Sequence, residues 1–512
     1  MNLTRRDCLQ TLVSTTCFTG LIGALGNTLE AGDADPKQKS TGSVQPDVEI
    51  ELRAAATELP LLKGEKTPVW RFEGKVVKGR NDALTASDSY LGPTLHLVRN
   101  ERIRIHFDNN VDAPSIVHWH GLIVPEAADG LPRQAIRPKE RYTYDFIVQN
   151  PAGTYLYHSH PHMQTGEQVY RGLAGILIVH DAAEDKIGLP AGDQDLTLAI
   201  QDRRVDAQNR FAYQRSMMDH MSGVLGDTIL VNGRPNAGFR VERRPYRLRL
   251  ANVSNARIYK LAWSDGSPLN VIGTGSGLLS GDEGPQKRPF IVLAPGQRAE
   301  IWEDFSVRKS GATVNLVSEK FTIPGGMRGM MGKGMMGKGM MMNMGSDELR
   351  IARFEVQTGE ARPGPLPKLL GQKPKLPEAR REVRTTLAFR MMRGLLNGRI
   401  YKEDDLLDSE RLKLNEPIHW IFDNATEMGM QMAHPMHIHA VQFRVVERKG
   451  NGANELAKGI IDDGCQDTVL ILPGETVKLH VTPTQPGLFM YHCHNLEHED
   501  MGMMRDFRVT AD

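Results

Sequence analysis

Histidines in this chain occur in pairs separated by a single residue, and four such pairs stand out. Residues i and i+2 of a β-strand point to the same face, so each pair directs two imidazoles to one place. With 17 histidines in 512 residues, random placement would give about one such pair or fewer. Transition metals take roughly four to six ligands per ion, so eight imidazoles favour a site with several ions. The pairs are His118 and His120, His158 and His160, His437 and His439, and His492 and His494.

Cys493 stands between the last two histidines. Strand alternation turns its side chain to the opposite face, so it belongs to a different site. A thiolate with two imidazoles and a weak thioether ligand is typical of a blue-copper electron-transfer centre. Zinc is the rival ion, but it prefers more thiolate or carboxylate ligands. The candidate ligands are His434, Cys493, His498 and Met503.

The shared strand would connect the two sites. Cys493 would bind the electron-accepting metal, and its neighbours His492 and His494 would bind the cluster, so an electron has a short covalent path. One copper ion delivers a single electron, whereas the reduction of O₂ to water takes four. A four-copper store can do this without releasing superoxide or peroxide. Two sites joined in this way would therefore suit the reduction of O₂.

The segments that carry these residues read as β-strands. Runs such as TLHLVRNERIRIHFDNN, LAGILIVHD and GLFMYHCH are apolar or alternate, and Gly, Pro, Asn and Asp interrupt them. Strands at this spacing favour β-sandwiches over parallel βαβ units. Two phrases recur, PAGTYLYHSH at 151–160 and QPGLFMYHCH at 485–494, which indicates internal repetition.

The repetition and the length together predict three units, at 45–183, 190–357 and 380–512. A Pro-rich linker at 358–379 precedes the third unit. The second unit contains an insertion at 325–345 that is nearly all Met and Gly. Because the histidine pairs fall in the first and third units, neither unit alone could enclose the cluster, whereas an interface between these two could.

Composition and the N-terminus narrow the class of protein. Lys and Arg total 63 and Asp and Glu total 62, so charge indicates neither nucleic acid nor an acidic membrane surface as a partner. Residues 1–31 place Arg5 and Arg6 before a short apolar run interrupted by Thr, Ser and Gly. This predicts a twin-arginine signal peptide and a periplasmic or otherwise exported protein without a membrane span. Cleavage would leave Cys465 and Cys493, too few for a disulfide framework, and whether Cys465 is free stays open.

The sequence resembles the multicopper oxidases over almost the whole mature chain. It is most similar to the bacterial three-domain branch, which includes cuprous oxidases, laccases and bilirubin oxidases. The motifs that carry the resemblance are HWHGLIVPEAADGLP, YHSHPHMQTGEQVYRGLAGILIVHD, HPMHIHAVQFRV and HCHNLEHEDMGMM. The resemblance implies an all-β fold of three cupredoxin-like Greek-key β-sandwich domains. It also implies four copper ions: one type 1, one type 2 and a binuclear type 3 pair.

Family roles carried over by position give a ligand set. His118 and His437 would hold the type 2 copper, and the four residues named above would hold the type 1 copper. The two type 3 ions would be held by His120, His158 and His494, and by His160, His439 and His492. The family counterpart of His162 is not a ligand. Asp129 and Glu499 match carboxylates that manage protons near the cluster, as water formation in a buried site requires.

Several methionines indicate which electron donor the protein uses. Thioethers prefer Cu(I), so 325–345 could collect Cu(I), and Met428, Met430 and Met432 could line the approach to His434. The alternative is a flexible loop or a lid over a phenol pocket, and the loop's three basic residues would repel cations. An axial Met503 implies a less oxidising blue site, which favours Cu(I) and electron-rich phenols. The leading hypothesis is copper detoxification.

Three other functions use copper sites of a similar kind. A general laccase or bilirubin-oxidase-like enzyme without a role in copper homeostasis is the alternative. An electron-transfer protein without oxygen chemistry would not need eight cluster histidines. A copper nitrite reductase is built from two-domain subunits that share a site, whereas this chain carries every motif itself. A complete ligand set permits a monomer that uses O₂ with Cu(I) or small phenolic and aromatic-amine donors.

Overall fold

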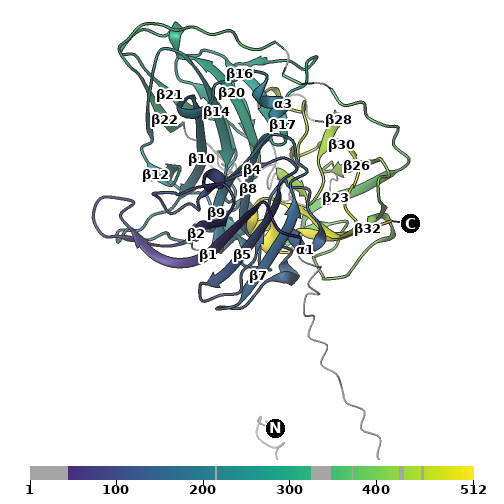
Figure 1. Ribbon diagram of the computed structural model, residues 1–512. Coiled ribbons are helices and arrows are strands. Elements are labelled where there is room, and N and C mark those ends of the chain that lie inside the picture. The colour runs from purple at the N-terminus through teal and green to yellow at the C-terminus, as the bar shows by residue number, and fades with distance from the viewer. Residues whose placement is uncertain are drawn as a thin grey trace, which may run out of the picture. The chain divides into compact units, whose positions relative to one another are not determined.

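The structure is a computed structural model that describes residues 44–213, 216–323, 348–368, 370–371, 373–390, 393–425, 432–450 and 455–511. Strands dominate it, and the all-β expectation is confirmed. Figure 1 shows the strands in three groups, purple to blue, teal, and green to yellow, in the order of the chain. The predicted signal segment 1–31 and the Met-rich insertion 325–345 lie outside the described residues, so both stay predictions.

Each group contains two sheets, and the three groups are called the first, second and third sandwich. The first sandwich consists of a four-stranded and a five-stranded sheet. One has the order β2-β1-β5-β7 and the other β3-β4-β9-β8-β6. Their apolar faces enclose a buried cluster that includes Ile50, Phe72, Trp119 and Tyr157. The strands are β1 (Val48–Leu59), β2 (Thr67–Lys78), β3 (Leu84–Thr85), β4 (Thr94–Val98), β5 (Arg102–Asn110), β6 (Val117–His118), β7 (Arg141–Ile147), β8 (Gly153–Ser159) and β9 (Ala174–His180).

The second group pairs an eight-stranded sheet, in which β12-β11-β10-β14-β20-β16-β17 is joined by β18, with the sheet β13-β22-β21-β15-β19. Its core includes Leu250, Trp263 and Phe354. The strands are β10 (Asp195–Arg203), β11 (Thr228–Val231), β12 (Arg234–Pro235), β13 (Gly238–Val241), β14 (Pro245–Asn252), β15 (Tyr259–Trp263), β16 (Leu269–Thr274), β17 (Gly277–Leu278), β18 (Gln286–Arg288), β19 (Ile291–Leu293), β20 (Arg298–Asp304), β21 (Thr313–Ser318) and β22 (Leu349–Val356).

The third group again has two sheets, β24-β23-β26-β30-β28 and β25-β32-β31-β27-β29. Trp420, Tyr491 and Phe507 pack in its core together with Cys493 and Met503. The strands are β23 (Glu382–Arg390), β24 (Arg393–Leu396), β25 (Arg411–Lys413), β26 (Ile418–Asp423), β27 (His434–Ile438), β28 (Phe443–Lys449), β29 (Thr468–Ile471), β30 (Thr476–Val481), β31 (Gly487–Cys493) and β32 (Met504–Thr510).

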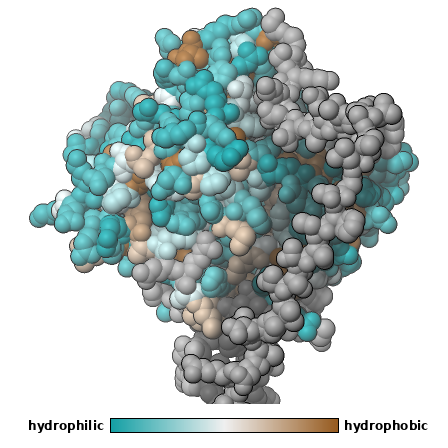
Figure 2. All heavy atoms as spheres, turned by 90° about the horizontal axis from the view of Figure 1, so that it is seen from below, coloured by the Kyte–Doolittle hydropathy of each residue, from teal (hydrophilic) through white to brown (hydrophobic). Residues whose placement is uncertain are grey.

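In the described part of the chain, five short α-helices lie in the connections: α1 (Glu126–Asp129), α2 (Thr165–Arg171), α3 (Ala182–Asp185), α4 (Met217–Ser222) and α5 (Leu496–Asp500). None of the helices in the described ranges has the length and apolar character that a membrane crossing requires. The face drawn in Figure 2 is mostly hydrophilic, with scattered apolar spots. Cys465 and Cys493 are both free thiols. The limits 45–183, 190–357, 358–379 and 380–512 stay predictions.

Candidate metal centres

Two pairs of antiparallel strands position the histidines. In the first sandwich β6 pairs with β8, which sets His118 opposite His158. In the third sandwich β27 pairs with β31 in the same way, which sets His437 opposite His492. The second member of each pair lies two residues further along the chain, at the end of the strand or just beyond it. All eight side chains are buried.

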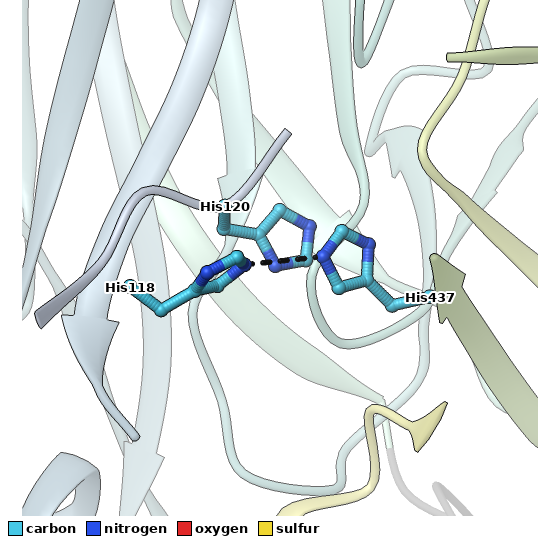
Figure 3. Close-up of side chains that lie close together, drawn as sticks. All are labelled: His118, His120 and His437. Atoms are coloured by element: carbon cyan, nitrogen blue, oxygen red, sulfur yellow. Dashed lines mark hydrogen bonds between the residues drawn. The ribbon is translucent and has the colours of Figure 1, made fainter. Parts of the chain in front are cut away.

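The eight imidazoles meet between the first and third sandwiches. Three groups of three have ligand atoms within 4.8 Å of one another: His118, His120 and His437; His120, His158 and His494; and His160, His439 and His492. Figure 3 shows the first group, where 3.3 Å separates Nε2 of His118 from Nε2 of His437. In the third group, 3.1 Å separates Nε2 of His439 from Nε2 of His492. The structure thus brings together every histidine that the sequence assigns to the cluster.

Hydrogen bonds to backbone and carboxylate oxygens fix the orientation of three of these rings. His118 Nδ1–H donates to the carbonyl of Asp129 at 2.8 Å, and His437 Nδ1–H donates to the carbonyl of Asp467 at 2.8 Å. His439 Nδ1–H donates to the Asp129 carboxylate, also at 2.8 Å. A proton held on Nδ1 leaves the Nε2 lone pair for a metal ion. The three Nε2 atoms therefore face the space between the sandwiches, where they could bind metal ions.

The cluster fits metal ions by its unpaired nitrogens. Among the described residues, His158 Nε2, His120 Nδ1 and both ring nitrogens of His494 are buried without a hydrogen-bond partner. Burying a polar atom without a partner costs free energy, which a bound cation would offset. Burial and the neighbouring rings also lower the pKa of His118, His120 and His494 well below 6.5. Neutral imidazole is the ligating form, so this donor set suits copper.

A second group lies on the other face of β31. Cys493 Sγ is 3.5 Å from Nδ1 of His434 and 3.6 Å from Nδ1 of His498. Burial raises the pKa of the Cys493 thiol. A coordinating metal ion deprotonates a thiol outright, so a thiolate here depends on such an ion. The residues fit a single copper held by sulfur and nitrogen.

Met503 is joined to this group through its backbone. Its carbonyl accepts from the Cys493 N–H at 3.0 Å, and its N–H donates to the His498 carbonyl at 3.0 Å. The side chain is fully buried. A Cβ added at Gly394 would come within 3.0 Å of the Met503 sulfur, so glycine leaves the room that the thioether occupies.

The two predicted carboxylates contact different histidines of the cluster, Asp129 at His439 and Glu499 at His492. Asp129 belongs to α1, and burial raises its pKa well above 3.8. Glu499 belongs to α5, with Oε2 3.0 Å from Nδ1 of His492. Burial alone would raise the pKa of Glu499, but the nearby imidazoles of His492 and His160 outweigh it and hold the pKa well below 4.5. Asp129 keeps its proton and Glu499 loses it, and two acids in these states at one cluster are suited to handling protons.

Sequence reasoning missed Asp467 and Arg298. Asp467 Oδ1 lies 3.0 Å from Nε2 of His120, and the Arg298 guanidinium holds the same carboxylate with contacts of 2.7 and 2.6 Å. Burial opposes ionisation of Asp467, but Arg298 outweighs it and lowers the pKa to about 2. The pair links the second sandwich to the cluster. Asp467 could have been found only from the pairing of β27 with β29, because QDTV carries no ligand pattern.

A third omission is α4, which covers the cysteine site from the second sandwich. His498 Nε2–H donates to the carbonyl of Met221 at 3.0 Å. Met221 packs with Phe389 and Met432 in a small buried cluster. His162, which the sequence sets aside, lies against the Tyr401 ring with 5.4 Å between centroids. Met428 and Met430 lie outside the described residues.

Fold and site together define a class: a β-sandwich protein with a single-copper thiolate site and a histidine cluster for several coppers. The chain belongs to the multicopper oxidase family. Multicopper oxidase models match residues 70–184 and 373–512. It is 31% identical to the multicopper oxidase mco of Staphylococcus aureus over 454 residues, which is 88% of each chain.

Two solved structures extend the comparison. A laccase-like multicopper oxidase CueO from a lignin-degrading Ochrobactrum sp. has a TM-score of 0.73 at 26% identity, covering 90% of this chain and 97% of that one. A multicopper oxidase from Campylobacter jejuni, described as a metallo-oxidase, has a TM-score of 0.73 at 25% identity, covering 90% and 91%. The protein is therefore a copper-dependent oxidoreductase with O₂ as acceptor and four copper ions, built on the cupredoxin fold.

Proposed function

We propose that the protein oxidises Cu(I) at the type 1 site and serves in copper tolerance, with oxidation of phenols and aromatic amines as a general activity. The observation that carries the proposal is the cysteine site itself: a buried thiol between two imidazoles, with the Met503 backbone tied to both Cys493 and His498. A thioether ligand favours a less oxidising site and hence easily oxidised donors. The lignin-active CueO and the metallo-oxidase represent the two donor classes among similar proteins.

The ligand roles form part of the proposal. His434, Cys493, His498 and Met503 would hold the type 1 copper, and His118 with His437 the type 2 copper. The remaining six cluster histidines would hold the type 3 pair in the two groups that lie together. Bound copper would supply one-electron transfer at the first site and reduction of O₂ to water at the cluster. Residues 492–494 would be the covalent link between the two sites.

Protons reach the cluster through its carboxylates in this proposal. Asp129 holds a proton beside His439 and His118, and Glu499 accepts one beside His492. Positioned groups of this kind contribute about 10²–10⁴-fold to a proton-transfer step. Export through the twin-arginine segment would place the enzyme outside the cytoplasm, where it would meet copper before the metal enters the cell.

Deletion of 325–345 tests the donor. We expect a fully loaded enzyme with blue colour and, after deletion, a roughly tenfold loss of Cu(I) turnover, equivalent to about 1.4 kcal/mol. Turnover of 2,6-dimethoxyphenol should stay within a factor of about two. A Gly/Ser replacement of equal length controls for loop length, and a variant with Arg328, Lys333 and Lys338 changed to Ala controls for charge. Equal activity on both donors after deletion would favour the general laccase.

A further inference from the structure

A cavity of about 500 Å³ is lined by Gly502, the residue that directly precedes Met503. Its lining draws on four distant parts of the chain: the loop after β8, helix α4, strand β24 with the loop that follows it, and the end of α5 with the loop after it. Two imidazoles and two thioethers line it, contributed by His162, Met163, His220 and Met501. Thioethers select Cu(I), and imidazole also suits copper. The cavity is thus chemically matched to a soft copper ion.

Met163 is held in an unusual state for an apolar residue. Its side chain is 60% exposed, and its backbone has φ +62°, in the left-handed region that residues other than Gly, Asn and Asp rarely adopt. Backbone strain of this kind costs free energy and clusters at functional sites. An exposed thioether in such a conformation contributes little to the core. Its position at the cavity suggests a contact with something that enters.

Polar and charged groups also line the cavity. His220 Nδ1 is buried and has no hydrogen-bond partner among the described residues. The carboxylate of Asp500 also lines the cavity and accepts from the N–H groups of Thr165 and Gly166 at 2.9 and 3.1 Å. Arg393 lines the cavity as well and opposes a cation. A monovalent ion held mainly by neutral sulfur and nitrogen tolerates this balance better than a divalent one does.

The cavity has short routes to the type 1 site. His220 directly precedes Met221, whose carbonyl accepts the hydrogen bond from His498 Nε2–H at 3.0 Å. An electron from a metal on His220 therefore crosses one backbone step and one hydrogen bond to reach a type 1 ligand. Met501 offers a second route, since it lies two residues before Met503.

We propose that this cavity is the docking site from which Cu(I), as substrate, gives its electron to the type 1 site. The inference rests on the proposed function, because it requires Cu(I) as donor. Each Cu(I) loses one electron and leaves as Cu(II), which is less suited to thioether ligands. Four Cu(I), one O₂ and four protons give four Cu(II) and two water molecules.

A double variant of the holoenzyme, Met163→Leu with His220→Gln, tests the site. We expect the KM for Cu(I) to rise about tenfold or more, while the KM for 2,6-dimethoxyphenol changes less than twofold. Ag(I), a redox-inert stand-in for Cu(I), should inhibit Cu(I) oxidation competitively in the wild type and about tenfold more weakly in the variant. Met218→Leu is the matched control, because Met218 is a 47% exposed methionine of α4 that does not line the cavity.

The outcomes separate this inference from the proposed function. Unchanged blue absorption and copper content establish that the variant is folded and loaded. If the wild type oxidises Cu(I) and the double variant does so with the same KM, the inference is wrong and the proposed function stands. An equal rise in both KM values overturns it too, since the cavity would then hold organic donors. A wild type that does not oxidise Cu(I) refutes both.

Discussion

Two strands of this molecule, β8 and β31, carry nearly the same phrase and make different sites. A histidine pair spans the end of each strand, and its first histidine lies opposite the first histidine of a second pair on the neighbouring strand. Both direct imidazoles into the shared cluster. The residue between the histidines, on the opposite face, is Ser159 in β8 and Cys493 in β31.

The residues around Ser159 and Cys493 occupy corresponding positions in the two sandwiches but are of different types. Counted from the histidine pairs, His434 corresponds to Ser115, His498 to Gln164, and Met503 to Val169. In the first sandwich Ser115 Oγ donates to Gln168 Oε1 at 2.9 Å, in the place where the third sandwich sets an imidazole against sulfur. The same arrangement of two paired strands therefore occurs twice, and each copy contributes four histidines to the cluster. A few side chains decide whether the arrangement also forms the cysteine-containing copper site.

Cys493→Ser gives the third sandwich the residue of the first, and we expect the largest effect from it. The copper count should fall from four to three per chain, because a serine hydroxyl cannot replace the thiolate. The blue absorption should disappear and donor turnover should fall to background, while the cluster keeps its ions. Absorption spectra and metal analysis measure this. A variant that stayed blue would show that Cys493 is not a ligand of the type 1 copper.

Glu499→Gln breaks a second asymmetry, since the first sandwich has Thr165 at the corresponding place. We expect turnover with O₂ to fall about 10²-fold, the lower end for a positioned proton-transfer group. Anaerobic bleaching of the blue band by a donor should keep its rate, because Cys493, His434 and His498 are untouched. Stopped-flow absorption separates the two steps. Equal slowing of both steps would mean that the residue acts structurally.

The sequence could predict the parts of the site that follow from strand periodicity. Alternation is local, so it places His492 and His494 on one face and Cys493 on the other without knowledge of the fold. Repetition of that pattern in two units also indicates an interface between them. The all-β class follows from the same short alternating runs.

Contacts made by the second sandwich could not be predicted in this way. Arg298 on β20 holds Asp467, and Met221 on α4 accepts from His498, yet neither residue lies near a ligand in the chain. Which surfaces of two domains meet depends on the packing of many side chains, and no short periodic pattern encodes it. Asp467 is missed for a related reason, since its contact with His120 spans 347 residues.

Ser159→Cys gives the first sandwich the residue of the third, the opposite of Cys493→Ser, and should have the smallest effect. It places a thiol on β8, but Ser115 and Gln164 stand where the third sandwich has His434 and His498. Without two imidazoles a single thiol does not make a blue-copper site, so the copper count and the blue band should stay unchanged. Ser159 Oγ is buried without a hydrogen-bond partner among the described residues, so replacing it leaves no group unsatisfied, and stability should change by about 1 kcal/mol or less. Metal analysis and denaturant unfolding test this, and a second blue centre in the variant would show that the cysteine alone, rather than the whole ligand set, makes the difference between the two strands.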